Sequence, residues 1–258
     1  MPERLRVADP DPAPGPDWLA QQGIPGQREE VALRVLGRRI TVQLWSPGEG
    51  ELPLLLAHDG PEYDERAALT RWAGAMIERG ALEPFRVALL PPGERDQWYS
   101  ASAAYGRSLR HRILPALGEL VPVAGRPVAM GASLGALGML QVQRAWPGTF
   151  AGMFLQSGSF FVPRFDRHES GFPRYGRIVR FVRGVLRAGP YDDPVPVAVT
   201  CGAQEENIHN NRLMARALSG QGYDVELVEM PGAHDWPSWR DALDPHLTRL
   251  LGEVWRRR

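Results

Sequence analysis

The chain has 258 residues, 43% of them hydrophobic, and its 30 basic side chains balance 30 acidic ones. Zero net charge argues against nucleic-acid binding as the main role, because domains that bind nucleic acids usually carry a basic excess. Every basic residue is an arginine, which excludes mechanisms that need a lysine, such as a Schiff base or a phosphate-binding P-loop.

The length fits one large domain or two small ones. Residues 1–28 are rich in proline and polar side chains, and we expect an extended or poorly ordered lead-in there. From residue 29 the pattern becomes that of a folded chain, and residues 29–258 are expected to form a single domain. Within it, residues 160–192 are longer than a simple helical crossover needs, so we expect an insertion above the sheet.

The order of elements after the lead-in predicts the fold class. Apolar and polar side chains alternate on both sides of Gly37, which predicts an antiparallel hairpin. Short apolar runs predict strands buried on both faces at residues 52–60, 85–92, 126–133, 150–158, 195–202 and 223–230. Helices are predicted over residues 66–80, 100–120, 134–146, 175–187, 207–221 and 237–256. This alternation predicts an α/β fold with a mostly parallel, doubly wound sheet and helices on both faces.

A candidate nucleophile lies between one of these strands and the following helix. Gly131-Ala132-Ser133-Leu134-Gly135 matches G-x-S-x-G, a motif that needs structural context to be informative. A strand–turn–helix setting is the context of a nucleophile elbow, in which side chains at the two glycine positions would collide with the neighbouring strand and helix. The helix N-terminus points at the serine, and the Leu134 N–H can donate to a developing oxyanion. The alternative is a glycine-rich turn with an idle serine.

A serine hydroxyl needs a general base, and the base needs an orienting acid. His234 is the candidate base among six histidines, because it follows the last predicted strand and the expected chain order is Ser, acid, His. Glu205 and Glu206 follow the preceding strand, which ends at Gly202. We favour Glu205, because a short turn after Gly202 would aim it toward the loop of His234. Glu206 stays open as the alternative.

Three further residues are candidates for substrate binding. His58 ends a strand upstream of the serine, so its role is either hydrogen bonding within its loop or contact with the substrate. Arg95 and Trp98 follow another strand and are expected at the rim of the same face, where they bind substrate or serve surface packing and ion pairing. No metal site is expected, because HExxH is absent and the histidines lack ligand spacing.

Several separated stretches together resemble the enterochelin-esterase-like branch of the putative esterases (esterase D type), within the α/β-hydrolase superfamily. The matching stretches are LLLAHDGPEY, GERDQWYSASAAYGRSL, PVAMGASLGAL, FLQSGSFF, CGAQEENIHNNRLMARAL and PGAHDWPSWRDAL. The resemblance implies ester hydrolysis without metal or cofactor, with Ser133 as nucleophile, His234 as base and an acid in the Glu205–Glu206 pair. In related hydrolases a second oxyanion donor comes from the loop that here reads HDGP. Because Pro61 has no N–H, Gly60 or a residue slightly beyond it must donate.

The expected function is therefore that of a serine carboxylic-ester hydrolase, which acts through an acyl-enzyme on a small or siderophore-like ester. An acyltransferase on the same scaffold and a non-catalytic ligand-binding member of the fold are the alternatives. Two interpretations of the insertion also stay open: a lid that attracts an anionic ester, or an amphipathic cover with its arginines in water. The arginines concerned are Arg164, Arg167, Arg174, Arg177, Arg180, Arg183 and Arg187.

Cysteine content and hydropathy bear on location and partners. Cys201 is the single cysteine, which excludes an internal disulfide framework and fits a reducing compartment, so we expect a cytoplasmic protein. No secretory signal and no apolar run long enough to span a membrane is visible. The expected partner is a small-molecule ester, with no nucleic acid and no membrane, and the sequence gives no oligomeric state.

Overall fold

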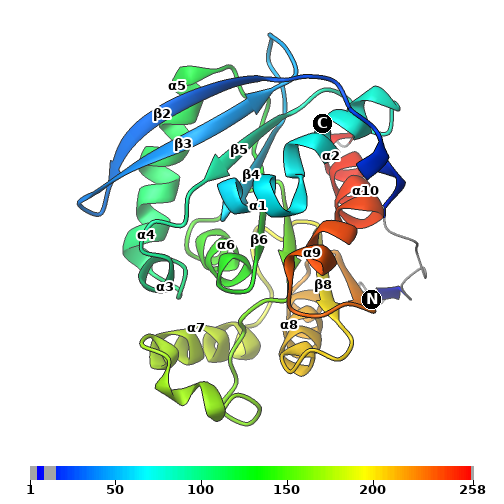
Figure 1. Cartoon of the computed structure of the whole chain (residues 1–258). Helices are drawn as coiled ribbons and strands as arrows, with labels where there is room; N and C mark the ends of the chain where they lie inside the picture. Colours follow the sequence, from blue (N-terminus) through cyan, green and yellow to red (C-terminus); the bar gives the residue numbers. More distant parts are fainter. Residues whose placement is uncertain (1–4, 9–15, 257–258) are drawn as a thin grey trace.

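The computed structural model describes residues 5–8 and 16–256, which form a nine-stranded sheet with helices on both faces (Figure 1). Across the sheet the strand order is β1-β9-β8-β7-β6-β4-β5-β3-β2. The strands are β1 (Leu5–Ala8), β2 (Gln27–Val35), β3 (Arg38–Ser46), β4 (Leu54–His58), β5 (Arg86–Leu90), β6 (Val128–Ala132), β7 (Gly152–Gln156), β8 (Val197–Gly202) and β9 (Val225–Met230). Only the two pairings made by β3 are antiparallel, so the predicted mostly parallel, doubly wound sheet is confirmed.

The first part of the chain contains more regular structure than a plain lead-in. β1 pairs parallel with β9, and Trp18 of the short helix η1 (Asp17–Ala20) is fully buried. β2 and β3 form the predicted hairpin, and its turn residues Leu36 and Gly37 have φ of 49° and 83°. Two-residue turns with positive φ match the twist of the flanking strands, which is why a glycine fits there. Residues 1–4 and 9–15 lie outside the described residues.

The helices follow the predicted positions with some breaks. They are α1 (Gly60–Ala67), α2 (Leu69–Glu78), α3 (Arg95–Trp98), α4 (Ala103–Ser108), η2 (Leu109–Ile113), α5 (Leu114–Leu120), α6 (Leu134–Ala145), η3 (His168–Gly171), α7 (Tyr175–Arg187), α8 (Ile208–Gly220), α9 (Trp236–Asp241), η4 (Leu243–Leu247) and α10 (Thr248–Arg256). The helix predicted over residues 237–256 is broken because Asp244 is extended (φ −123°, ψ 122°), and a residue before proline avoids helical angles. The helix predicted over residues 66–80 is likewise two, separated by Ala68 at φ 52°.

Two hydrophobic cores lie on the two faces of the sheet. Helices α4, α5, α6 and α8 cover one face, and α1, α2, α9 and α10 cover the other. In β4, Leu54 and Leu56 belong to the first core, whereas Leu55 and Ala57 belong to the second. Successive side chains of a strand point to opposite faces, so a continuous apolar run is what burial on both faces requires.

The segment between β7 and β8 lies at one end of the molecule, below α6 and beside α8 in Figure 1. Its helix α7 contacts α8 and buries Ile178, Val182 and Val185, while most of its arginines are exposed. Arg177 instead donates to the main-chain carbonyls of Gln97 and Ser100, which ties α7 to the segment that contains α3. None of the described helices is long and apolar enough to cross a membrane.

Candidate active site

Ser133 occupies a sharp turn between β6 and α6, with φ 56° and ψ −122°. A positive φ costs a residue with a side chain on the order of 1–3 kcal/mol, so the surroundings must hold the turn in place. The Ser133 N–H donates to the Gln156 carbonyl oxygen at 2.9 Å, and the Ser133 carbonyl oxygen accepts from the Ser159 N–H at 3.1 Å. The main chain around β7 thus fixes the turn on both sides, in the geometry of a nucleophile elbow.

Close contacts surround the two glycines of the motif. A Cβ atom on Gly131 would lie 2.6 Å from the main-chain carbon of Gly135, at the start of α6. A Cβ atom on Gly135 would lie 3.2 Å from Cβ of His58, at the end of β4. The contact at Gly131 leaves no room for a side chain, whereas the contact at Gly135 is tight and would need a small shift of His58.

His58 supports this turn from the core. Its Nδ1 lies 2.9 Å from the Gly135 carbonyl oxygen and its Nε2 lies 2.9 Å from the Tyr105 hydroxyl. Burial lowers the pKa of His58 to about 3, so the ring is neutral. Nδ1 therefore donates to the carbonyl, and Nε2 accepts from Tyr105. The predicted substrate contact of His58 is wrong, because the side chain is fully buried, and its hydrogen bonds go to α6 and α4 rather than to its own loop.

The structure brings Glu205 and His234 together. His234 Nδ1 lies 2.7 Å from Glu205 Oε2, and Glu205 Oε1 accepts from the Gly202 N–H at 2.7 Å and from the Ser157 hydroxyl at 2.8 Å. Burial alone raises the pKa of the Glu205 carboxyl, but the hydrogen bonds from His234, Gly202 and Ser157 outweigh it and hold the pKa below its usual value. An ionised Glu205 keeps the proton of a neutral His234 on Nδ1, which leaves Nε2 as an acceptor.

Glu206, the alternative acid, lines the same cavity but approaches His168 instead of His234. Its side chain is 74% exposed, and its Oε2 lies 3.4 Å from His168 Nε2. Side chains of adjacent residues in a turn point in different directions. The turn therefore distinguishes the two glutamates that the sequence left as candidates for the orienting acid. Only Glu205 reaches His234.

Ser133, Leu134, Glu205 and His234 line one cavity of about 770 Å³. This volume is in the range of small-molecule sites. The Ser133 hydroxyl hydrogen-bonds Ser159 Oγ at 3.0 Å, and the described residues give no hydrogen bond between Ser133 and His234. The nucleophile candidate and the His–Glu pair therefore share a cavity, with the serine hydroxyl held by a second serine.

The charges around this cavity are mostly negative. The insertion contributes aromatic and acidic side chains to the wall, including Phe161 and Phe172, and none of its seven arginines is among the lining residues. This wall disfavours the interpretation of the insertion as an arginine lid over the cavity. The carboxylates that line it are Asp96, Asp166, Glu169, Glu205 and Glu206.

The remaining predicted residues divide between cavity and core. Arg95 lines the cavity, where its guanidinium pairs with the Asp59 carboxylate at 2.9 Å. Trp98 is 1% exposed and stacks on Tyr105, so its predicted substrate contact is wrong. Gly60 begins α1, is buried and does not line the cavity, in contrast to Leu134.

Sequence reasoning missed two serines that follow β7. The Ser157 hydroxyl donates to Glu205 and accepts from Trp239 Nε1 at 3.1 Å, and Ser159 contacts Ser133. Their position after the strand next to β6 is the signal that could have found them, because the carboxyl ends of parallel strands meet at one edge of a sheet.

Among the described residues, His168, Glu169 and Glu206 are the group that could hold a metal ion.

Comparison with known proteins places the chain among esterases by sequence. A model of the family described as "Putative esterase" matches residues 34–250. The iron(III) enterobactin esterase of Dickeya dadantii is 28% identical over 204 residues, which cover 74% of this chain and 46% of that protein. The chain thus spans less than half the length of this relative. The uncharacterized protein YjcH of Bacillus subtilis is 22% identical over 209 residues, 77% of this chain and 84% of that protein.

Solved structures agree on the fold. The enterobactin esterase FES from Shigella flexneri superposes with a TM-score of 0.79 at 19% identity, over 95% of this chain and 63% of that chain. The feruloyl esterase module from Clostridium thermocellum gives a TM-score of 0.68 at 13% identity, over 96% of this chain and 95% of that chain. The predicted α/β-hydrolase fold is confirmed by these similarities.

Proposed function

Because the chain belongs to the putative esterase family, we propose that it is a serine carboxylic-ester hydrolase that acts through an acyl-enzyme on Ser133. One observation carries the proposal. Ser133 opens α6 at a strained turn and lines the same cavity as His234, whose Nδ1 lies 2.7 Å from the buried carboxylate of Glu205. A nucleophile at a helix N-terminus with a carboxylate-oriented histidine in the same cavity supports acyl transfer.

The first half of the proposed reaction acylates the serine. His234 Nε2 accepts the Ser133 proton as Oγ attacks the ester carbonyl carbon, and Glu205 stabilises the resulting imidazolium. The Leu134 N–H donates to the oxyanion, and one such donor contributes on the order of 3 kcal/mol. His234 then gives its proton to the oxygen of the leaving alcohol as the carbon–oxygen bond breaks.

The second half releases the acid. His234 accepts a proton from water, and the water oxygen attacks the carbonyl carbon of the acyl-enzyme. Collapse of this second tetrahedral intermediate breaks the bond to Ser133 Oγ, which recovers its proton from His234. The cycle consumes one ester and one water and needs no cofactor.

We propose a small or siderophore-like ester as the substrate. The cavity volume of about 770 Å³ and the rings of Phe161 and Phe172 in its wall support an ester with an apolar or aromatic part. One relative is named as an iron(III) enterobactin esterase, and one structural neighbour is a feruloyl esterase module. The carboxylates of the wall favour a neutral or cationic ester over an anionic one. The cytoplasm is the proposed location, supported by the single, buried free thiol of Cys201.

A panel of esters tests the function. Purified protein is assayed on aryl esters of increasing acyl length, then on hydroxycinnamate and catecholate esters, with Ser133→Ala and Ser219→Ala beside the wild type. Ser219 lies on α8 and outside the lining of the cavity. We expect hydrolysis that Ser133→Ala lowers at least about 10³-fold and that Ser219→Ala leaves unchanged. Equal hydrolysis by wild type and Ser133→Ala would overturn the proposal, and added alcohols that trap the acyl group would favour the acyltransferase.

A further inference from the structure

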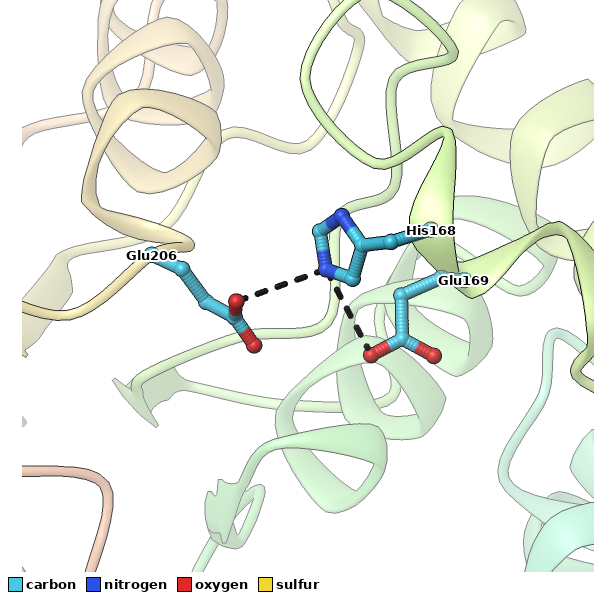
Figure 2. A group of neighbouring side chains, drawn as sticks. All are labelled: His168, Glu169 and Glu206. Atoms are coloured by element: carbon cyan, nitrogen blue, oxygen red, sulfur yellow. Dashed lines mark ion pairs between the residues drawn. The ribbon is translucent and has the colours of Figure 1, made fainter.

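Three metal-ligating side chains converge at the cavity from two separate segments. Figure 2 shows His168, Glu169 and Glu206 pointing toward one another. His168 and Glu169 belong to η3 of the insertion, and Glu206 belongs to the loop that follows β8. His168 Nε2 lies 3.4 Å from Glu206 Oε2 and 3.9 Å from Glu169 Oε1, and one ligand atom of each residue lies within 4.8 Å of the other two.

These separations approach those of a metal centre. Around a tetrahedral zinc ion with bonds of about 2.0–2.2 Å, neighbouring ligand atoms lie about 3.4 Å apart. The pair His168–Glu206 already has this spacing, at 3.4 Å. The other separations are longer, and small rotations of the side chains can shorten them, because His168 and Glu206 are exposed and Glu169 is half-buried.

The local charge gives a second argument. Neither Glu169 nor Glu206 forms an ion pair with an arginine in the described part of the chain, although arginines pair with acids at many other places on the surface. Both carboxylates approach the same imidazole nitrogen instead. Neither carboxylate is neutralised by an arginine among the described residues, and both lie near the Nε2 atom of His168. A metal ion bound by all three side chains would need this arrangement.

We propose that His168, Glu169 and Glu206 bind one divalent transition-metal ion of the zinc class. His168 would supply the lone pair of Nε2, and each glutamate would supply one oxygen. The imidazole ligand favours zinc-class ions over calcium and magnesium, which prefer oxygen ligands alone. Three protein ligands leave one tetrahedral position for water or for an oxygen atom of a molecule in the cavity.

The site would join the insertion to the loop that carries Glu205. Glu206 is the next residue in the chain, so a bound ion would restrain the loop at the Glu205–His234 pair. The sequence predicts no metal site because HExxH is absent and the histidines lack ligand spacing, whereas the fold brings Glu206 to His168 and Glu169. The proposal is independent of the esterase function, because metal binding is measured directly.

The test measures bound metal on tag-free protein. The full chain is stripped with a chelator, dialysed against micromolar zinc, and its metal content is measured by mass spectrometry beside a thermal melt. We expect about one zinc ion per chain and a raised Tm. His168→Ala and Glu206→Gln should each lower zinc affinity at least about tenfold and remove the rise in Tm. His111→Ala, which removes an exposed histidine outside the cluster, should retain both.

Other outcomes would overturn the proposal. Wild-type protein that binds no zinc under these conditions contradicts it, as does zinc bound equally by the wild type, His168→Ala and Glu206→Gln. Tighter binding of calcium than of zinc contradicts the assignment to the zinc class. Thermal melts without metal show whether each variant is folded. If His168→Ala does not fold, Glu206→Gln decides the test, because glutamine has nearly the same shape as glutamate. Cys201 does not compete, because burial raises the pKa of its thiol.

Discussion

Ser133 Oγ lies 3.0 Å from Ser159 Oγ, and the Ser159 N–H also donates to the Ser133 carbonyl oxygen at 3.1 Å. The loop after β7 therefore holds both the hydroxyl and the main chain of the candidate nucleophile. Ser159 is 6% exposed and lines the cavity. We infer that Ser159 is a positioning residue, whose hydroxyl keeps the Ser133 side chain directed into the cavity.

Replacing Ser159 tests this relationship. In Ser159→Ala the main-chain hydrogen bond remains, and only the hydroxyl contact is lost. A neutral hydrogen bond contributes about 1 kcal/mol, so kcat/KM should fall about fivefold while Tm changes little. Ser159→Thr keeps a hydroxyl and should recover much of the rate. Equal kcat/KM values for Ser159→Ala and the wild type would show that the serine contact is incidental.

Glu205→Gln tests the acid that orients His234. The amide can no longer stabilise the imidazolium and favours the wrong tautomer of the ring, so kcat should fall about 10³- to 10⁴-fold. Glu206→Gln, assayed after treatment with a chelator, should lose much less, because its side chain does not reach His234. Steady-state rates on one aryl ester make the comparison. A larger loss in Glu206→Gln than in Glu205→Gln would contradict the assignment.

The buried neutral His58 predicts a dependence of stability on pH. Its pKa is lowered from 6.5 to about 3 in the folded protein, so between these values the unfolded chain binds a proton that the folded chain does not. Stability should therefore fall as the pH drops below 6.5. His58→Gln should be less stable at neutral pH but should lose less on acidification. Urea unfolding at pH values from 7 to 5 measures both slopes, and parallel slopes would contradict the prediction.

Glycine-to-alanine substitutions at Gly131 in the elbow and at Gly184 on α7 should change stability in opposite directions. A Cβ on Gly131 would meet the main chain of α6 at 2.6 Å, so Gly131→Ala should destabilise the fold by about 1–3 kcal/mol and abolish hydrolysis. Gly184 is an exposed residue of α7 with open space around it, and Gly184→Ala should stabilise by about 0.5–1 kcal/mol. Denaturant titration compares the two variants. A Gly131→Ala protein as stable as Gly184→Ala would contradict the steric account.

The sequence predicts those parts of the fold and the site that depend on local patterns. The strand–turn–helix around Ser133 follows from an apolar run, two glycines and a helical run, and the structure has the same order. Chain order also selected His234 and two adjacent glutamates. Which glutamate faces the histidine depends on the turn after β8, and neighbouring residues of a turn differ in direction.

Features that depend on contacts between distant segments escape local patterns. His58 looks like a polar residue at the end of a strand, and only the approach of Tyr105 and the Gly135 carbonyl shows that its burial is satisfied. The arginines of α7 look like a cationic lid, whereas the loop before α7 is what lines the cavity. Glu206 and His168 become neighbours only through the packing of the insertion.

Covalent labelling shows directly whether Ser133 is an activated nucleophile. The folded protein is treated with a fluorophosphonate, which reacts with activated serines, and its intact mass and labelled peptide are determined. We expect one adduct per chain on Ser133, none on Ser133→Ala, and slow labelling of a His234→Ala variant. The absence of an adduct on the folded wild type, or an adduct on a serine other than Ser133, would contradict it.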